Sequence, residues 1–180
     1  MSRFKKIDAA AATGRTKELL NSVKQKFGMA PNITRVMANS PAVLEGYLSF
    51  SGALAGGTLD QKLRERIAIA VASVNQCDYC LAAHTSAGKM MGLSREELTA
   101  AQQSKSGGEK ESIAMRFATK LVRERGWVGD EDVNALRQAG FDDGQIIEII
   151  GTTALNIFTN YFNHVAETEI DFPQVNAVAA

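Results

Sequence analysis

The sequence is poor in cysteine and histidine and carries no net charge. It contains two cysteines, two histidines, three prolines and one tryptophan in 180 residues, and twenty basic side chains balance twenty acidic ones. A neutral chain has no electrostatic attraction to nucleic acid or to an anionic membrane surface. No apolar run approaches the roughly 20 residues that cross a bilayer, and the basic start lacks the apolar segment of a secretory signal. We therefore expect a cytoplasmic protein that binds neither nucleic acid nor membrane.

The composition is that of one globular domain. Hydrophobic residues make up 45% of the chain and charged residues 22%, which is typical of folded soluble proteins. The length allows a single domain, residues 1–180, with a real core. Apolar residues recur with helical spacing, and strand patterns are nearly absent, so the sequence predicts an all-α fold of about eight helices. The expected helices span residues 16–27, 41–55, 58–75, 77–92, 94–103, 109–125, 130–139 and 142–167.

Several helix ends carry specific start signals. Ser40 precedes a proline at the first helical position, and Ser94 with its glutamate three residues later forms a capping box. Thr58 with Gln61 has the same spacing and predicts a helix start at Thr58. Asp78 is expected to be a capping carboxylate at the start of the fourth expected helix.

Two helices are more apolar than a lone surface helix requires. They contain the stretch IAIAVAS, residues 67–73, and the segment from Ile146 to Phe162. A helix that is apolar nearly all round is central to its fold or buried at a subunit interface. We therefore predict that both contribute partly to contacts between subunits. The tail from Asp171 is expected to be loose or docked on a neighbouring subunit.

The chemical content of the chain is concentrated between Glu65 and His84. Cys77 and Cys80 are three residues apart at a predicted helix start, where they share a face and where the helix terminus lowers a thiol pKa. His84 lies one turn beyond Cys80 on that face and is a candidate general base. If the two helices form an antiparallel hairpin turning near Gln76, Glu65 reaches the imidazole and orients it. The pattern predicts thiol redox chemistry.

Other interpretations of these residues remain open at this stage. The two cysteines could be inert core residues, or Cys77, Cys80, His84 and His164 could hold a structural zinc ion. The phenol of Tyr79 could bind a substrate or a thiolate, or simply pack. His164 could be a half-exposed helix residue or could line a pocket. A thioredoxin fold is excluded because no βαβ pattern surrounds the dithiol. Apart from the zinc alternative, we expect no metal and no cofactor.

A weaker pattern repeats this spacing near the C-terminus. Glu148, Asn160 and Asn163 are separated as Glu65, Cys77 and Cys80 are. The repeat is compatible with an internal duplication and equally with coincidence.

The spacing E-x11-C-x2-C-x3-H resembles the core of the alkylhydroperoxidase D-like proteins of the carboxymuconolactone decarboxylase superfamily. The resemblance covers residues 40–100 by motif, and the closing segment NHVAETEIDFP is similar to the last helix of peroxidase-related members. It implies an all-helical fold that assembles as a trimer or hexamer. The prototype carries a second histidine between the cysteines where this chain has Tyr79, and tyrosine is no base near neutral pH.

The resemblance also implies roles for the four residues of the motif. Cys80 attacks the peroxide and becomes a sulfenic acid, Cys77 resolves it as a disulfide, and His84 with Glu65 relays the proton. The partners implied are a peroxide substrate and an external dithiol reductant, such as a dihydrolipoyl protein or a thioredoxin-like protein. We therefore interpret the chain as a thiol peroxidase. Two alternatives remain, namely a redox-sensing regulatory protein and a non-redox lyase or binding protein on the same scaffold.

Overall fold

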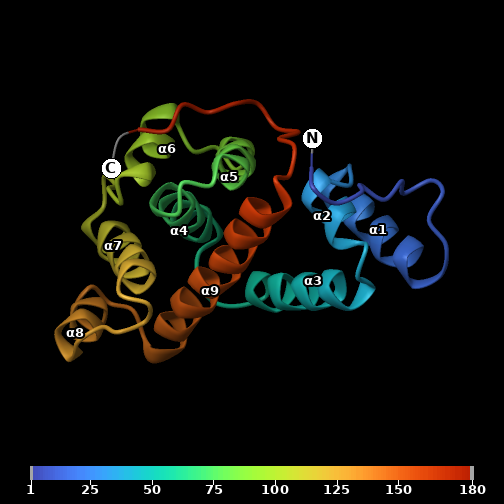
Figure 1. Cartoon of the computed structure of the whole chain (residues 1–180). Coiled ribbons are helices and arrows are strands. Elements are labelled where there is room, and N and C mark those ends of the chain that lie inside the picture. The colour runs from blue at the N-terminus through green and yellow to red at the C-terminus, as the bar shows by residue number, and fades with distance from the viewer. Residues whose placement is uncertain (1, 179–180) are drawn as a thin grey trace.

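The computed structural model describes residues 2–178, which form nine α-helices and no strand (Figure 1). The all-α prediction is confirmed, with one helix more than the eight expected. The helices are α1 (Gly14–Phe27), α2 (Asn32–Met37), α3 (Pro41–Ala55), α4 (Gln61–Val74), α5 (Asp78–Met90), α6 (Arg95–Gln102), α7 (Glu109–Arg123), α8 (Asp130–Gln138) and α9 (Asp143–Ala166).

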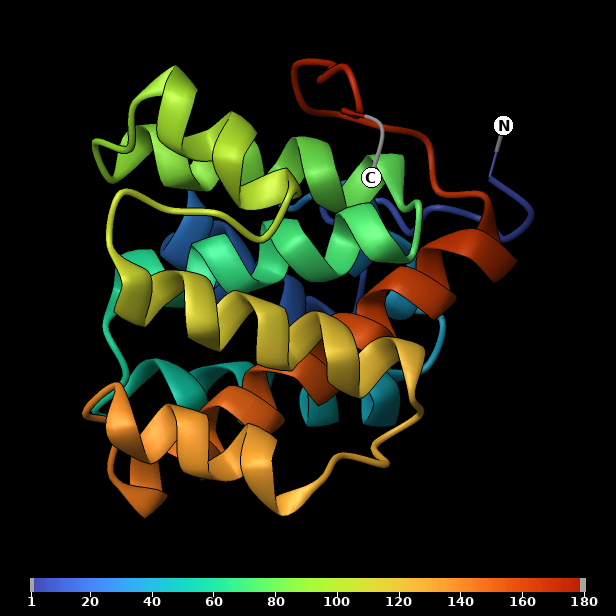
Figure 2. The same ribbon diagram turned by 90° about the vertical axis from the view of Figure 1, so that its left-hand side faces the viewer.

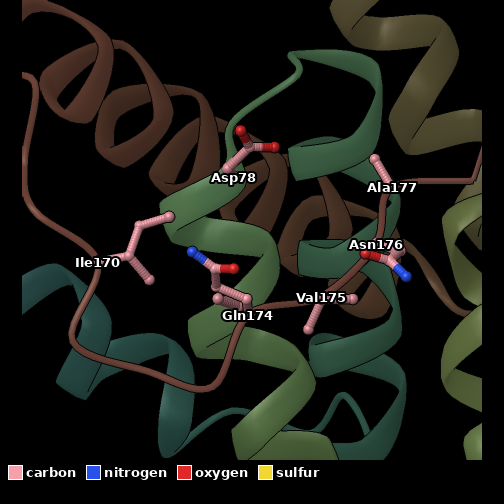
Figure 3. Close-up of a pocket in the computed structure, with 7 residues that line it drawn as sticks. Asp78, Ile170, Gln174, Val175, Asn176 and Ala177 are labelled. Carbon is pink, nitrogen blue, oxygen red and sulfur yellow. The ribbon is translucent and has the colours of Figure 1, made fainter.

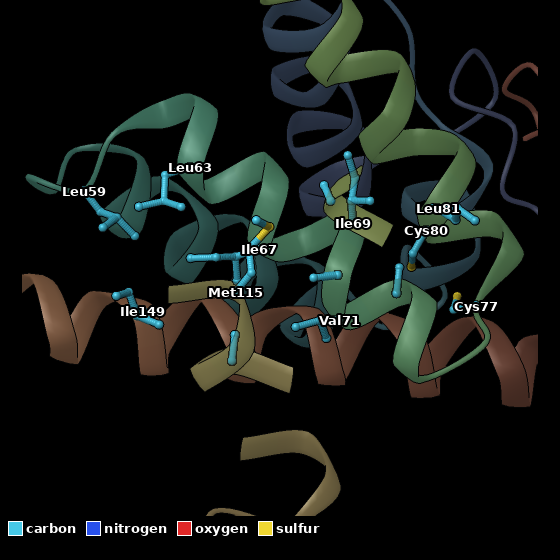
Figure 4. Close-up of a cluster of buried hydrophobic side chains, with 14 of the residues drawn as sticks. Leu59, Leu63, Ile67, Ile69, Val71, Cys77, Cys80, Leu81, Met115 and Ile149 are labelled. Carbon is cyan, nitrogen blue, oxygen red and sulfur yellow. The ribbon is translucent and has the colours of Figure 1, made fainter. Parts of the chain in front are cut away.

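Helix α4 lies at the centre of the fold and packs against α5, α6, α7 and α9 (Figure 2). Residues 67–72, which alternate large and small side chains, are all buried within this one chain. Small residues let neighbouring helices approach from several sides, while each isoleucine or valine fills the space between them (Figure 4). The prediction that residues 67–73 contribute to subunit contacts is therefore wrong, because residues 67–72 are already buried within the monomer.

Two helix starts and one whole helix differ from the sequence prediction. Helix α4 begins at Gln61 because the Asp60 side chain accepts the backbone N–H of Leu63 at 2.9 Å, and Thr58 lies outside the helix. At the start of α5 the capping position belongs to Cys77, whose side chain makes no capping bond, and Asp78 is the first helical residue. Helix α2 was not predicted, because six residues are too few to show a helical repeat.

Helix α9 is apolar on its outside and polar on its inside. Its capping box at Asp142 and Gln145 is present, and the helix runs across α3, α4, α5 and α7. The exposed outer face carries Ile147, Ile150, Phe158, Tyr161 and Val165. The buried inner face carries a stripe of polar side chains, which are Thr152, Thr153, Asn156, Thr159, Asn160 and Asn163. A polar stripe facing inward is unusual because buried polar groups need partners, and it faces the start of α5.

The C-terminal tail docks on its own chain. It passes over α5 and reaches α6 (Figure 1). Asp171 accepts the Tyr79 hydroxyl at 2.8 Å and the Asn32 N–H at 2.7 Å, and the Val178 N–H donates to Gln102 at 2.8 Å. The expectation of a loose tail, or one bound to a neighbouring subunit, is wrong for residues 171–178.

Within residues 2–178, no helix combines the length and the apolar character that a membrane crossing requires.

Candidate functional site

The turn between α4 and α5 places the two cysteines. Gln76 adopts the left-handed backbone conformation, with φ of 55°, and the Cys77 N–H returns to the Ala72 carbonyl at 2.9 Å. The chain therefore reverses sharply and starts α5 directly beside the end of α4. Cys77 and Cys80 are free thiols, 2% and 3% exposed, and both sit at the α5 N-terminus against α9 (Figure 4).

Cys80 is the thiol that this environment activates. Its pKa falls to about 6, chiefly through the hydrogen bond from Cys77, against the opposing effect of burial. The positive charge of His84 and the Asn163 amide, whose Nδ2 lies 3.2 Å from Cys80 Sγ, lower it further. The same hydrogen bond and burial raise the pKa of Cys77 far above that of an ordinary thiol. The opposite shifts therefore favour the thiolate on Cys80 and the proton on Cys77.

The structure brings Glu65 and His84 together. The antiparallel hairpin of α4 and α5 puts Glu65 Oε2 2.8 Å from His84 Nδ1. Burial alone would lower the pKa of His84, but the charge and hydrogen bond of Glu65 outweigh it and raise that pKa above the usual value of 6.5. The thiolate of Cys80 and the amide of Asn156 act in the same direction. The protonated form of His84 is therefore favoured relative to that of a free imidazole, and this form can give a proton to a leaving group.

Tyr47 of α3 also lies at this site, and the sequence analysis did not single it out. Burial and the negative charges of Cys80 and Glu65 raise its pKa to about 12. Its phenol therefore remains protonated at neutral pH. In the sequence nothing distinguishes Tyr47 from an ordinary core aromatic on an apolar helix.

Tyr79 packs and holds the tail. Its side chain is buried, its hydroxyl donates to Asp171 at 2.8 Å and accepts the Ile33 N–H at 3.1 Å, and its ring meets Phe172 edge-on at 5.7 Å. Burial raises its pKa well above that of free tyrosine, so the phenol stays a donor. The hydroxyl of the residue between the cysteines thus points to the tail.

His164 lines a cavity that leads to Cys77. This cavity has a volume of about 370 Å³ and is also bordered by Asp78, Glu167 and Ile170. Cys80 is not among its lining residues. A second cavity of about 310 Å³ lies beside it, between Asp78 and the tail residues 174–177 (Figure 3). The cavity is thus bordered by Cys77 and by Asn163, whose amide contacts Cys80.

The described residues give no support to the zinc alternative. Nowhere in residues 2–178 do three or more histidine, cysteine, aspartate or glutamate side chains converge as metal ligands. His164 faces the cavity from the exposed side of α9, whereas His84 is bound to Glu65.

Helix α9 supplies the site residues that sequence reasoning missed. Asn163 contacts Cys80, Asn156 acts on His84, and the Asn160 Oδ1 accepts from the Asn75 amide at 2.8 Å. The repeated spacing of Glu148, Asn160 and Asn163 was the available signal. Glu148 itself takes no part in proton transfer at Cys80, because it accepts the backbone N–H groups of residues 58 and 59 at 2.9 and 2.7 Å.

Comparison with known proteins finds a family model that is similar to the segment around the dithiol. Residues 41–120, from α3 to most of α7, match the carboxymuconolactone decarboxylase family. The matched segment contains Glu65, Cys77, Cys80 and His84. An uncharacterised protein of Haemophilus influenzae is 38% identical over 69 residues, which are 38% of this chain and 56% of that relative. The match thus spans little more than half the length of that relative.

Solved structures share the fold over nearly the whole chain. One, titled as an alkylhydroperoxidase AhpD core and as an uncharacterised peroxidase-related protein of Ralstonia eutropha JMP134, has a TM-score of 0.86 at 23% identity, covering 94% of this chain and 92% of that one. The debrominase Bmp8, solved with 2,3,4-tribromopyrrole, has a TM-score of 0.82 at 18% identity, covering 95% and 92%. These likenesses show the alkylhydroperoxidase D-like fold of the chain.

Proposed function

We propose that this chain is a thiol-dependent peroxidase in which Cys80 attacks a peroxide. The observation that carries the proposal is the placement of two buried thiols, Cys77 and Cys80, at the start of α5, with His84 one turn further on and its Nδ1 2.8 Å from Glu65 Oε2. This environment lowers the pKa of Cys80 to about 6 and raises that of His84. A thiolate is the nucleophile for peroxide, and a charged imidazole is the acid that the departing oxygen needs.

In the first step, the Cys80 sulfur bonds to one peroxide oxygen and the O–O bond breaks. The other oxygen leaves as an alkoxide or hydroxide and takes a proton from His84, which gives an alcohol or water. Cys80 is then a sulfenic acid. Cys77 attacks that sulfur, the S–S bond forms, and water leaves with the proton of the Cys77 thiol.

An external dithiol then reduces the disulfide through the cavity that Cys77 lines. A thiolate of the reductant attacks Cys77 and expels Cys80, and its second thiol closes to release Cys77. This direction is favoured because the better leaving group is the thiol of lower pKa, which is Cys80. A small dithiol, a dihydrolipoyl arm or a thioredoxin-like protein fits the requirement for two thiols.

The tyrosine between the cysteines bears on the rate. Because the Tyr79 hydroxyl donates to Asp171, the relay relies on His84 with Glu65 alone. We expect an active peroxidase in which one histidine, His84, donates the proton to the departing oxygen.

A redox-sensing role is the second candidate, and one contact favours it. Tyr79 lies between the two cysteines and holds the tail through Asp171. A change in the dithiol that moves Tyr79 would therefore be transmitted to residues 171–178. This role predicts that oxidation frees the tail without catalytic turnover.

We also propose that the chain forms a homo-oligomer, a trimer or hexamer. The support is the exposed apolar face of α9, where Ile147, Tyr161 and Val165 are more than half exposed. Contiguous exposed apolar surface on a folded protein commonly marks an interaction site.

A coupled assay tests the peroxidase. Hydrogen peroxide and an alkyl hydroperoxide are supplied with dihydrolipoamide or a thioredoxin system, and peroxide loss is followed for wild type, Cys80→Ser and Cys77→Ser. A brominated pyrrole is tested as a third substrate because the debrominase Bmp8 shares the fold. We expect no turnover from Cys80→Ser, and from Cys77→Ser at most one peroxide per chain before reduction. Undiminished turnover in Cys80→Ser would contradict the assignment of Cys80 as the peroxide-reducing thiol.

A further inference from the structure

Two asparagine side chains of α9 meet the reactive sulfur. Asn160 and Asn163 are three residues apart on one face of the helix, and they are 0% and 4% exposed. The Asn163 Nδ2 lies 3.2 Å from Cys80 Sγ. The Asn160 Oδ1 is occupied by the Asn75 amide at 2.8 Å, which fixes the plane of the Asn160 side chain.

Both asparagines have unused hydrogen-bonding groups in a buried place. The Asn160 Nδ2 and the Asn163 Oδ1 are buried and make no hydrogen bond in the reduced protein. Buried polar atoms without partners are rare because each loses its bonds to water. Here one spare donor and one spare acceptor lie at the same end of α9, next to Cys80.

We propose that Asn160 and Asn163 form an amide cage that holds Cys80 as a thiolate and then binds the oxygen that Cys80 takes from the peroxide. The second half rests on the proposed function, and the first half does not. In the reduced state the Asn163 amide N–H faces the negative sulfur, with its Nδ2 3.2 Å from Cys80 Sγ. After the O–O bond breaks, the new S–O–H group has one acceptor oxygen and one donor proton. The Asn160 Nδ2 donates to that oxygen, and the Asn163 Oδ1 accepts the proton.

The cage also accounts for the repeated spacing in the sequence. Asn160 and Asn163 stand at the positions that correspond to Cys77 and Cys80 in the first copy of the pattern. An amide there cannot undergo thiol chemistry, but it supplies what a buried thiolate lacks, namely uncharged N–H donors. A hydrogen bond to a charged group is stronger than one between neutral groups, which makes amides effective here.

The first test measures the thiolate directly and needs no peroxide. Absorbance of the Cys80 thiolate at 240 nm is followed against pH in a Cys77→Ser background, alone and with Asn163→Leu. Leucine keeps the volume and removes the donor. We expect the titration midpoint to rise by about one pH unit or more. Thr153→Val is the matched control, since Thr153 is buried on α9 and its hydroxyl bonds only the Ile149 carbonyl at 2.8 Å. An unchanged titration midpoint in Asn163→Leu would contradict the proposal that the cage holds Cys80 as a thiolate.

The second test needs no change at the asparagine that it observes. Side-chain amide signals of Asn160 and Asn163 are followed by 15N NMR in the Cys77→Ser protein and are assigned by through-bond experiments that connect each side-chain amide to its own backbone. We expect the Asn163 signal to shift as Cys80 titrates and the Asn160 signal to shift when one equivalent of hydrogen peroxide is added. If the Asn163 signal does not shift as Cys80 titrates, the role of Asn163 in holding the thiolate is contradicted. This outcome can be read even if Asn163→Leu does not fold.

The two proposals fail in different ways. If mass spectrometry finds no oxygen added to Cys80, the peroxidase assignment fails, and the titration still decides the thiolate role. If oxygen is added and the Asn160 signal does not move, the oxygen-binding half of the cage fails and the peroxidase assignment survives.

Discussion

The contact between Glu65 and His84 gives the sharpest prediction. Glu65→Gln keeps the size of the side chain and a hydrogen-bonding oxygen but removes the negative charge. The distance of 2.8 Å between His84 Nδ1 and Glu65 Oε2 is that of a charge-assisted hydrogen bond. The His84 side chain is 29% exposed and the Glu65 side chain 17%, so water screens the pair incompletely. We therefore expect the change to act mainly on the protonation of His84.

The expected size follows from the strength of such a bond. A hydrogen bond to a charged group contributes about 1.5–3 kcal/mol, and Glu65→Gln removes the charged partner of the His84 imidazole. The pKa of His84 should therefore fall, because burial, which already opposes the charged form, then has less to counter it. With a less charged imidazole, Cys80 loses one of the charges that keep its pKa low.

Two measurements follow the effect. The chain has two histidines, and the His164→Gln background leaves only the imidazole carbon-bound proton signals of His84 to be followed against pH. The rate of iodoacetamide alkylation of Cys80, in a Cys77→Ser background, rises with pH as the thiolate forms. The variant should show a lower His84 midpoint and an alkylation profile displaced to higher pH.

The same shift affects folding stability with a defined sign. The pKa of His84 is raised in the folded state, so its contribution to stability is complete below the unfolded value near 6.5 and disappears as pH rises through the folded pKa. Urea unfolding of wild type and Glu65→Gln should therefore differ most at acidic pH and converge at pH 9. A His84 midpoint that is equal in the two proteins would refute the proposed relay.

Three further predictions concern the frame around the site. In Gly57→Ala the new Cβ would come 2.6 Å from the Glu148 carboxylate and push it off its backbone partners. The free energy of unfolding in urea should therefore fall by about 1–3 kcal/mol. Gly107→Ala is the control and should be nearly neutral, because its Cβ meets no atom within 4 Å. Asp171→Ala should make the tail a site of limited proteolysis, because two hydrogen bonds to the tail are lost; an unchanged cleavage pattern would contradict the tether. Tyr161→Glu should dissociate the oligomer in light scattering, since Tyr161 is 56% exposed on the apolar face of α9, and a wild type that elutes as a monomer would remove the basis of that prediction.

Most of the fold could be predicted from the sequence because helical signals are local. The capping box at Ser94 is present in the structure as the spacing predicts. The start of α4 could not be predicted as well, because Thr58 and Asp60 both carry capping side chains. A distant residue decides between them, since Glu148 accepts the N–H and the hydroxyl of Thr58.

The sequence by itself determined that a dithiol, an imidazole and a carboxylate would meet, since spacing within one helix and one hairpin is enough to bring them together. Only the tertiary structure decided how these groups are tuned. The Asn163 donor comes from a helix more than eighty residues away, and the Tyr79 hydroxyl is directed to the tail by Asp171. Both are long-range contacts between buried polar groups. Such contacts depend on how helices pack, and no periodicity within either segment encodes them.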